Sequence, residues 1–335
     1  MTNKLISHVK KKYDVIGLES PVMDCVVRLS HLPRSNMRQP IKDITWQGGG
    51  KVSTGLVATT RLGGTAAIIG TIGDDRNGAA VCNEFRHLGI DPQYLLVREG
   101  THTSMSVILS DEETGGRSIL FDRDPRLDMD EDELDTSIIE QGKYLFLSHF
   151  QPVHVKALRH AKQNGIITLM DSDNLRTNEE VWPYLHLVDY YIASEELYET
   201  LFNEPAEGER LQQHCLEMQR INQGVVIFTL GSRGLVGADA AGYFTLPAFP
   251  VEVVDTTGAG DVFHGAYLAA LLKGADARSA ARYASGAAAF KCTCLGGRAG
   301  IPDEAALTQF IKNGTIDQTG PKRHMAYYRS EKMFQ

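Results

Sequence analysis

The sequence has few cysteines and lacks any long apolar run. Five cysteines, an odd number, are scattered over 335 residues, which excludes a disulfide framework and suits reduced thiols. No stretch approaches the roughly 18 uncharged apolar residues of a membrane-spanning helix. The first residues, MTNKLISHVKKKYDVIG, also lack the apolar core of a secretory signal. A cytoplasmic location with no membrane partner is therefore expected.

An excess of positive charge is absent too. The formal net charge is -8, whereas nucleic-acid binding depends on clustered lysines and arginines that displace counterions. No nucleic-acid partner is expected. An anionic ligand would have to be held locally, by backbone amides, a metal ion or a few cationic side chains.

Short apolar runs alternate with helical patterns along most of the chain. The expected strands are residues 13–17, 66–72, 143–148, 165–171, 188–194 and 225–230. The expected helices are residues 52–62, 77–88, 152–164 and 207–223, each followed closely by a glycine. This order predicts an α/β protein with a mostly parallel sheet that is covered on both faces.

Two regions interrupt the alternation. Residues 22–29, 103–110 and 116–122 have the pattern of antiparallel strands, and inserted strands of this kind predict a small lid sheet over one edge of the main sheet. After about residue 313 the periodicity is lost, so residues 313–335 are expected to form a tail or a docking arm.

The stretch DTTGAGDVFHGA begins at Asp255 and leads into a strongly apolar helical pattern. The amides of Gly258, Ala259 and Gly260 can bind an anion at the electropositive helix start. Asp261 follows directly, and an aspartate with an ordinary pKa near about 3.9 can accept a proton from a hydroxyl group. The alternative is that Asp261 only complements the helix dipole and that the glycines only allow close packing.

The same stretch resembles the C-terminal motif of the ribokinase-like (PfkB) carbohydrate kinases. GGKVSTGLVATTRLGG, from Gly49 to Gly64, resembles the N-terminal motif of that family. The resemblance covers residues 13–312 and implies one ribokinase-like kinase domain, a three-layer α/β/α sandwich with a β-sheet lid drawn from about 18–46 and 100–124. ASGAAAFKCTCLGGRAGIPD is most similar to the ketohexokinase and sulfofructose kinase branch, which favours a ketose or a ketose derivative as substrate.

The resemblance assigns roles to individual residues. Asp261 is the catalytic base, with an anion hole formed by Gly258, Ala259 and Gly260. The implied sugar contacts are Asp24, Gly49, Gly50 and Thr54, and the implied nucleotide contacts are Thr229, Gly231 and Gly234. Mg²⁺ would be held through water by Glu196, and a monovalent cation such as K⁺, which some members of the family use, would lie beside Asp255, Thr257 and Gly296.

The expected activity is transfer of the γ-phosphoryl group from ATP, with Mg²⁺, to a hydroxyl group of a small sugar. A nucleoside kinase of the same fold and a non-catalytic sugar-binding or regulatory protein are the alternatives. His149, Asp171 and Asp173 lie at the carboxyl ends of predicted strands and can either contact the substrate or cap loops. The edges of the lid strands could pair with a second copy, so a homodimer is expected.

Overall fold

The computed structural model describes residues 11–172, 178–330 and 332–335. Its main sheet has nine strands in the order β13-β12-β11-β10-β9-β8-β1-β4-β5. The strands are β1 (Tyr13–Leu18), β4 (Ala66–Gly73), β5 (Ile90–Arg98), β8 (Gly142–Leu147), β9 (Ile167–Asp171), β10 (Tyr190–Ser194), β11 (Val225–Thr229), β12 (Leu235–Asp239) and β13 (Gly242–Leu246). All neighbours pair in parallel except β11 with β12 and β12 with β13.

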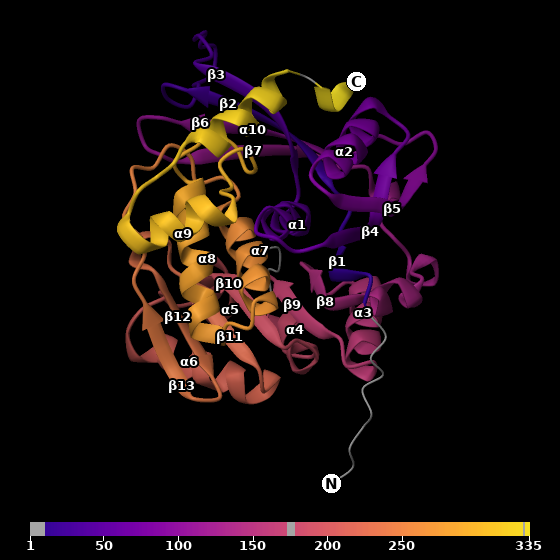
Figure 1. Cartoon of the computed structure of the whole chain (residues 1–335), viewed down its shortest axis with the longest axis vertical. Helices are drawn as coiled ribbons and strands as arrows, with labels where there is room; N and C mark the ends of the chain where they lie inside the picture. The colour runs from indigo at the N-terminus through magenta and orange to yellow at the C-terminus, as the bar shows by residue number, and fades with distance from the viewer. Residues whose placement is uncertain (1–10, 173–177, 331) are drawn as a thin grey trace.

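Successive residues of the central strands point to opposite faces of this sheet, because side chains alternate along a strand. Val15 and Phe146 belong to one apolar cluster, whereas Ile16 and Leu145 belong to the other. The first cluster includes residues of α1 (Lys51–Arg61), α2 (Arg76–His87), α7 (Ala259–Leu272), α8 (Ala277–Lys291) and α9 (Glu304–Asn313). The second includes residues of α3 (Pro152–Gln163), α4 (Asn178–Val181), α5 (Glu195–Phe202) and α6 (Gly208–Asn222). The predicted three-layer α/β/α sandwich is confirmed (Figure 1).

A second sheet, the lid sheet, has the strand order β3-β2-β6-β7. Its strands are β2 (Val22–Leu29), β3 (Asp43–Gly49), β6 (Met105–Asp111) and β7 (Arg117–Asp122). The expectation of purely antiparallel strands was wrong in one respect, because β2 and β6 pair in parallel. A parallel pair needs a long crossover connection, and here it runs through the main sheet.

Two segments of the main sheet were not predicted. β5 contains Pro92 and lies at the sheet edge, where a missing backbone N–H is tolerated. The hairpin of β12 and β13 forms the opposite edge. Both edges carry weaker apolar patterns than the central strands, and this is why the sequence did not reveal them. Among the described residues no helix has the length and apolar character needed to cross a bilayer.

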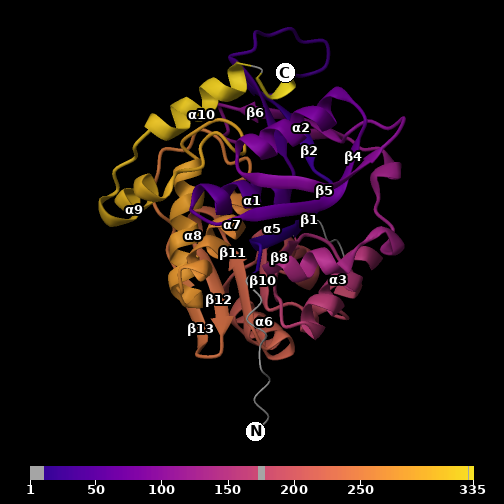
Figure 2. The same ribbon diagram turned by 45° about the vertical axis from the view of Figure 1, so that its right-hand side comes forward.

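The C-terminal segment was expected to be a tail or a docking arm, and the structure shows a docking arm over residues 319–329. Residues Thr319–Arg329 form α10, which lies along the lid sheet and α2 in both views (Figures 1 and 2). Pro321, Met325 and Tyr328 are buried, and their spacing of four and three residues places them on one helix face. Three buried side chains within a polar segment give the sequence little apolar periodicity, although they are enough to dock a helix.

Candidate active site

A cavity of about 1310 Å³ lies between the lid sheet and the carboxyl ends of the main strands. Asp24 from β2 and Phe121 from β7 line it on the lid side, and Asp261 at the start of α7 lines it on the other side. Arg117 of β7 crosses toward that helix, where its guanidinium group donates to Thr256 Oγ1 over 3.0 Å. The cavity therefore joins the predicted sugar contacts to the predicted catalytic helix.

The turn before α7 depends on glycine at one position. Gly258 has φ 73°, and a Cβ atom there would lie 2.9 Å from Gly297 Cα. Gly260 differs, since its Cβ would meet no protein atom within 4 Å, and it lines the cavity. Space beside Gly260 is therefore open to a ligand rather than filled by packing.

The three predicted amide donors are not equivalent. Ala259 N donates to Thr256 O over 3.1 Å, so its assignment as a free anion donor was wrong. The Val262 amide already closes the first turn onto Gly258 O. The Gly260 amide occupies a first-turn position that has no intrahelical acceptor. The helix start thus offers the amide of Gly260 rather than that of Ala259.

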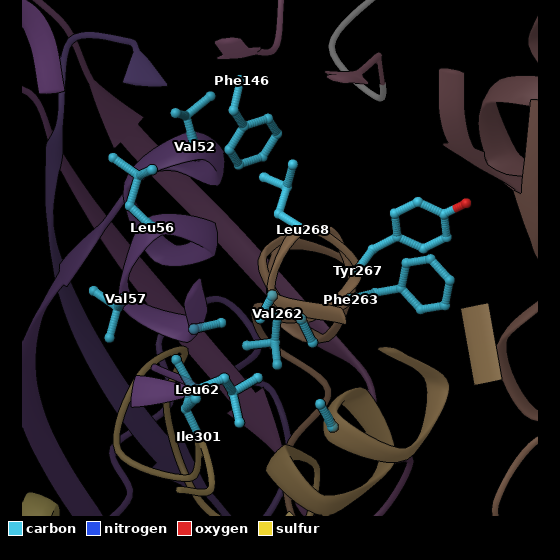
Figure 3. Packing of buried hydrophobic residues seen from close by; sticks show 14 of the residues in the cluster. Val52, Leu56, Val57, Leu62, Phe146, Val262, Phe263, Tyr267, Leu268 and Ile301 are labelled. Atoms are coloured by element: carbon cyan, nitrogen blue, oxygen red, sulfur yellow. The ribbon is translucent and has the colours of Figure 1, made fainter. Parts of the chain in front are cut away.

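Asp261 is held in place by a close crossing of α1 and α7. A Cβ atom on Gly265 would lie 1.9 Å from Gly55 O, and one on Gly55 would lie 3.1 Å from Asp261 O. Thr59 Oγ1 also donates to Gly265 O over 3.0 Å. Figure 3 shows the apolar side chains of both helices gathered at this crossing, with Phe146 beside Val52. The N-terminal and C-terminal sequence motifs therefore touch directly.

Asp24 lines the lid side of the cavity and is half-buried. A Cβ atom on Gly49 would lie 2.2 Å from Asp24 Oδ2, so Gly49 makes room for this carboxylate. Burial raises the pKa of Asp24 to about 6, against the opposing effects of the Arg298 charge and the Ser106 hydroxyl. Gly49 itself does not line the cavity, unlike Gly50.

Glu19 is a site residue that the sequence did not single out. It follows β1, lines the cavity and caps α1, because its carboxylate accepts from Ser53 N and Ser53 Oγ, each over 2.8 Å. Gly50 has φ 90°, and its Cβ would lie 2.5 Å from Glu19 Oε2. A charged residue directly after a central strand, near Asp24, was the available signal.

Thr54 does not reach the cavity, so its assignment as a sugar contact was wrong. It is 2 % exposed, and its hydroxyl accepts from Arg298 Nε over 3.2 Å. Arg298 is fully buried, donates to Gly49 O over 2.7 Å and pairs with Glu84 over 2.5 Å. Thr54 therefore belongs to a buried network that holds β3 against the start of α1.

The predicted nucleotide contacts lie together at the other end of the cavity. Thr229, Gly231 and Gly234 line its wall after β11. Glu196 lines the same region and is exposed, whereas the neighbouring Glu195 forms an ion pair with Arg233. Of these two carboxylates at the start of α5, Glu196 is the more exposed.

The predicted cation loop is only partly at the cavity. Thr257 lines the wall, whereas Asp255 and Gly296 do not. Asp255 is 3 % exposed; one carboxylate oxygen accepts from Thr257 N and Oγ1, and the other accepts from Gly296 N. Its pKa is lowered, since the Lys291 charge and these hydrogen bonds outweigh burial. The three residues do lie together, as predicted, although as a buried turn.

The polar residues expected after other strands have different positions. His149 lines the cavity, and burial, with the charges of Lys51 and Arg123, lowers its pKa to about 4, so the ring is neutral near pH 7. Asp171 lies behind the wall, 1 % exposed, with its carboxylate 3.4 Å from Lys51 Nζ. Asp173 is outside the described residues.

The comparisons with known proteins agree with this geometry. Fructokinase-1 of Zea mays is 27% identical over 79% of this chain and 88% of its own length. The 5-dehydro-2-deoxygluconokinase of Clostridium perfringens is 26% identical over 90% and 94%. A ribokinase of Arabidopsis thaliana, solved with ribose and ATP, superimposes with a TM-score of 0.74 at 21% identity over 90% of this chain and 99% of its own. Residues 11–304 match the family described as pfkB family carbohydrate kinase, and the chain therefore belongs to that family.

Proposed function

We propose that the protein transfers the γ-phosphoryl group of ATP to a hydroxyl group of a small sugar, with a ketose or a ketose derivative as the favoured substrate. The supporting observation is one cavity that has Gly260 and Asp261 on one wall and Asp24 on the opposite, lid side. A hydroxyl-binding carboxylate, a proton acceptor and an open helix start are the groups that this transfer needs.

In this mechanism Asp24 accepts hydrogen bonds from sugar hydroxyls and orients one of them toward Asp261. Asp261 takes the proton of that hydroxyl as its oxygen attacks phosphorus. The amide of Gly260 stabilises the charge that spreads over the phosphoryl oxygens. Arg117 ties the lid to Thr256, and closure of the lid keeps water from taking the phosphoryl group.

The nucleotide would occupy the end of the cavity where Thr229, Gly231 and Gly234 lie. Phe249 and Val251 add apolar surface there, which suits an adenine ring. Mg²⁺ supplies charge neutralisation of the phosphates when bound, and Glu196 would hold it through water, because this ion keeps several water ligands. The carboxylate oxygens of Glu196 and their exposure to solvent fit a hydrated Mg²⁺ ion.

The choice of sugar rests on relatives. Two of the relatives described above are by name a fructokinase and a 5-dehydro-2-deoxygluconokinase, and the stretch ASGAAAFKCTCLGGRAGIPD resembles the ketohexokinase branch. A ketose or a ketose derivative is the simplest substrate class that joins these observations.

A homodimer through the lid is part of the same proposal. The lid strand β7 lies at a sheet edge and exposes 51% of Ile119, 58% of Leu120 and 76% of Phe121. An exposed apolar edge strand favours pairing with another chain. Light scattering at micromolar concentration distinguishes a dimer from a monomer.

A coupled assay of ADP release over ketoses, aldoses, polyols, sugar acids and nucleosides, with Mg²⁺ present, tests the activity. Turnover with a ketose or a ketose derivative supports the proposal. Turnover with nucleosides alone would replace it with a nucleoside kinase. Sugar binding without ADP release, measured by calorimetry in parallel, would replace it with a non-catalytic sugar-binding protein.

A further inference from the structure

Lys291 is a buried cation that the mechanism above does not use. It is the last residue of α8 and is 0% exposed. Burying a lysine is unfavourable unless its ammonium group finds partners. Its Nζ atom donates to Asp255 O over 2.8 Å, so the side chain ends inside the turn that leads to the start of α7.

This turn and the end of α8 are joined at several further points. Val254 N and Asp255 N both donate to Cys292 O, and the Asp255 carboxylate accepts from Gly296 N over 2.8 Å. Lys291 is the main charge that lowers the pKa of Asp255. The segment 291–296 therefore presents one ammonium group to the turn that carries the anion-binding amides.

The oxygens of this turn do not fit a bound monovalent cation. Such an ion needs several carbonyl and carboxylate oxygens directed at one point. Here the Asp255 carbonyl accepts from Lys291, and both oxygens of its carboxylate accept from Thr257 and Gly296. The Thr257 hydroxyl also points at that carboxylate as a donor. A positive charge is already present where K⁺ was expected.

We propose that the Lys291 ammonium group is a built-in cation that takes the place of a monovalent metal ion in this turn. Nucleotide binding and phosphoryl transfer are therefore independent of K⁺. The charge lies one short turn from Gly258, so it favours anionic phosphate at the helix start. It also fixes Asp255 O and thereby the position of the Gly260 amide. The kinetic part of this inference rests on the proposed kinase activity, whereas the binding part does not.

The test compares K⁺ with tetramethylammonium at constant ionic strength, on the full chain. Calorimetry measures the Kd for ADP with Mg²⁺ in about 100 mM of either chloride salt, so that general screening is the same in both. The expected Kd values agree within about twofold. ADP binding at least about tenfold tighter in K⁺ would overturn the proposal.

Lys291→Met removes the charge and keeps a long apolar stem, and Lys273→Met is the matched control. Lys273 follows the last turn of α7 and pairs with Glu304 at the surface. We expect Lys291→Met to weaken ADP binding and lower kcat by at least about tenfold, with the KM for the sugar unchanged. The control should keep wild-type values.

Wild-type ADP affinity in Lys291→Met without K⁺ would also overturn the proposal. If this variant does not fold, as judged by circular dichroism, the comparison of salts on the wild-type protein decides. If no sugar is phosphorylated, the kinase proposal fails, and the Kd for ADP still tests the built-in cation.

Discussion

The crossing of α1 and α7 and the lid sheet are built in opposite ways, although both face the same cavity. At the crossing, Gly265 leaves room for Gly55 O only because it lacks a side chain. In β7, by contrast, every residue except Ser118 is exposed. Dense backbone packing resists displacement, whereas a strand with little buried surface opens at low free-energy cost. The proposed proton acceptor is thus anchored on the rigid part, and the proposed sugar contact Asp24 belongs to the sheet whose edge strand can move.

The largest loss of activity is expected for a substitution of Asp261, on the rigid side of the cavity. Asp261→Asn keeps the helix start but removes the proton acceptor, so kcat should fall by at least about 10²-fold. The measurement is steady-state ADP release with the sugar found in the screen. The Kd for ADP should remain near the wild-type value, and turnover close to wild type would refute the role of Asp261.

A substitution of Asp24, on the lid side, should change mainly the binding of the sugar. Asp24→Asn loses hydrogen bonds to a charged acceptor, each worth about 1.5–3 kcal/mol, so the KM for the sugar should rise by about tenfold or more. Its kcat should change much less than in Asp261→Asn. A loss in kcat as large as that of Asp261→Asn, with an unchanged KM for the sugar, would instead place Asp24 in the chemical step.

The raised pKa of Asp24 predicts how stability and sugar binding depend on pH. Its pKa is raised from the usual 3.8 to about 6, so the folded protein binds this proton more tightly than the unfolded chain does. The contribution of Asp24 to the free energy of unfolding therefore falls as pH rises through this range. Sugar binding needs the ionised form, so KM should rise about tenfold between about pH 7 and about pH 5 in the wild type. Asp24→Asn should lack this dependence, and a wild type with constant KM would contradict it.

A matched pair of glycine substitutions in α7 sharpens the comparison. Gly265→Ala would place Cβ 1.9 Å from Gly55 O, and overpacking of this kind costs about 1–3 kcal/mol of stability. Gly260→Ala meets no protein atom within 4 Å and should be neutral or stabilising by up to about 1 kcal/mol. Urea unfolding measures both. Equal stability of the two variants would show that the crossing is less rigid than its geometry indicates.

The smallest effect is expected at the exposed lid edge. Leu120→Ser removes an apolar side chain that is 58% exposed and does not line the cavity, and surface changes of this kind shift stability by less than about 0.5 kcal/mol. The dimer should weaken, as measured by light scattering over a dilution series, while kcat stays within about twofold. A dimer unaffected by this change would move the proposed interface away from β7.

Much of the fold could be predicted because its signals are local. The central strands have continuous apolar runs, and the start of α7 is marked by DTTGAGD. Edge strands such as β5 were missed, since a sheet edge tolerates Pro92. The position of Thr54 could not be predicted, because it depends on Arg298, which is 244 residues away in sequence. Ala259 was misassigned because the turn gives its amide a partner in Thr256, a detail of geometry rather than of composition.

The docking of the C-terminal segment has a consequence for how the chain is made. Arg329 pairs with Asp43 over 2.5 Å across 286 residues, and Phe334 packs edge-on against Trp46, with ring centroids 6.0 Å apart. During synthesis β3 leaves the ribosome early, and these partners emerge only near the end. Domains fold as units, and distant contacts form slowly. Trp46 at the base of the lid therefore stays uncovered until the C-terminal segment has been translated. Chaperones can bind the exposed lid during that interval.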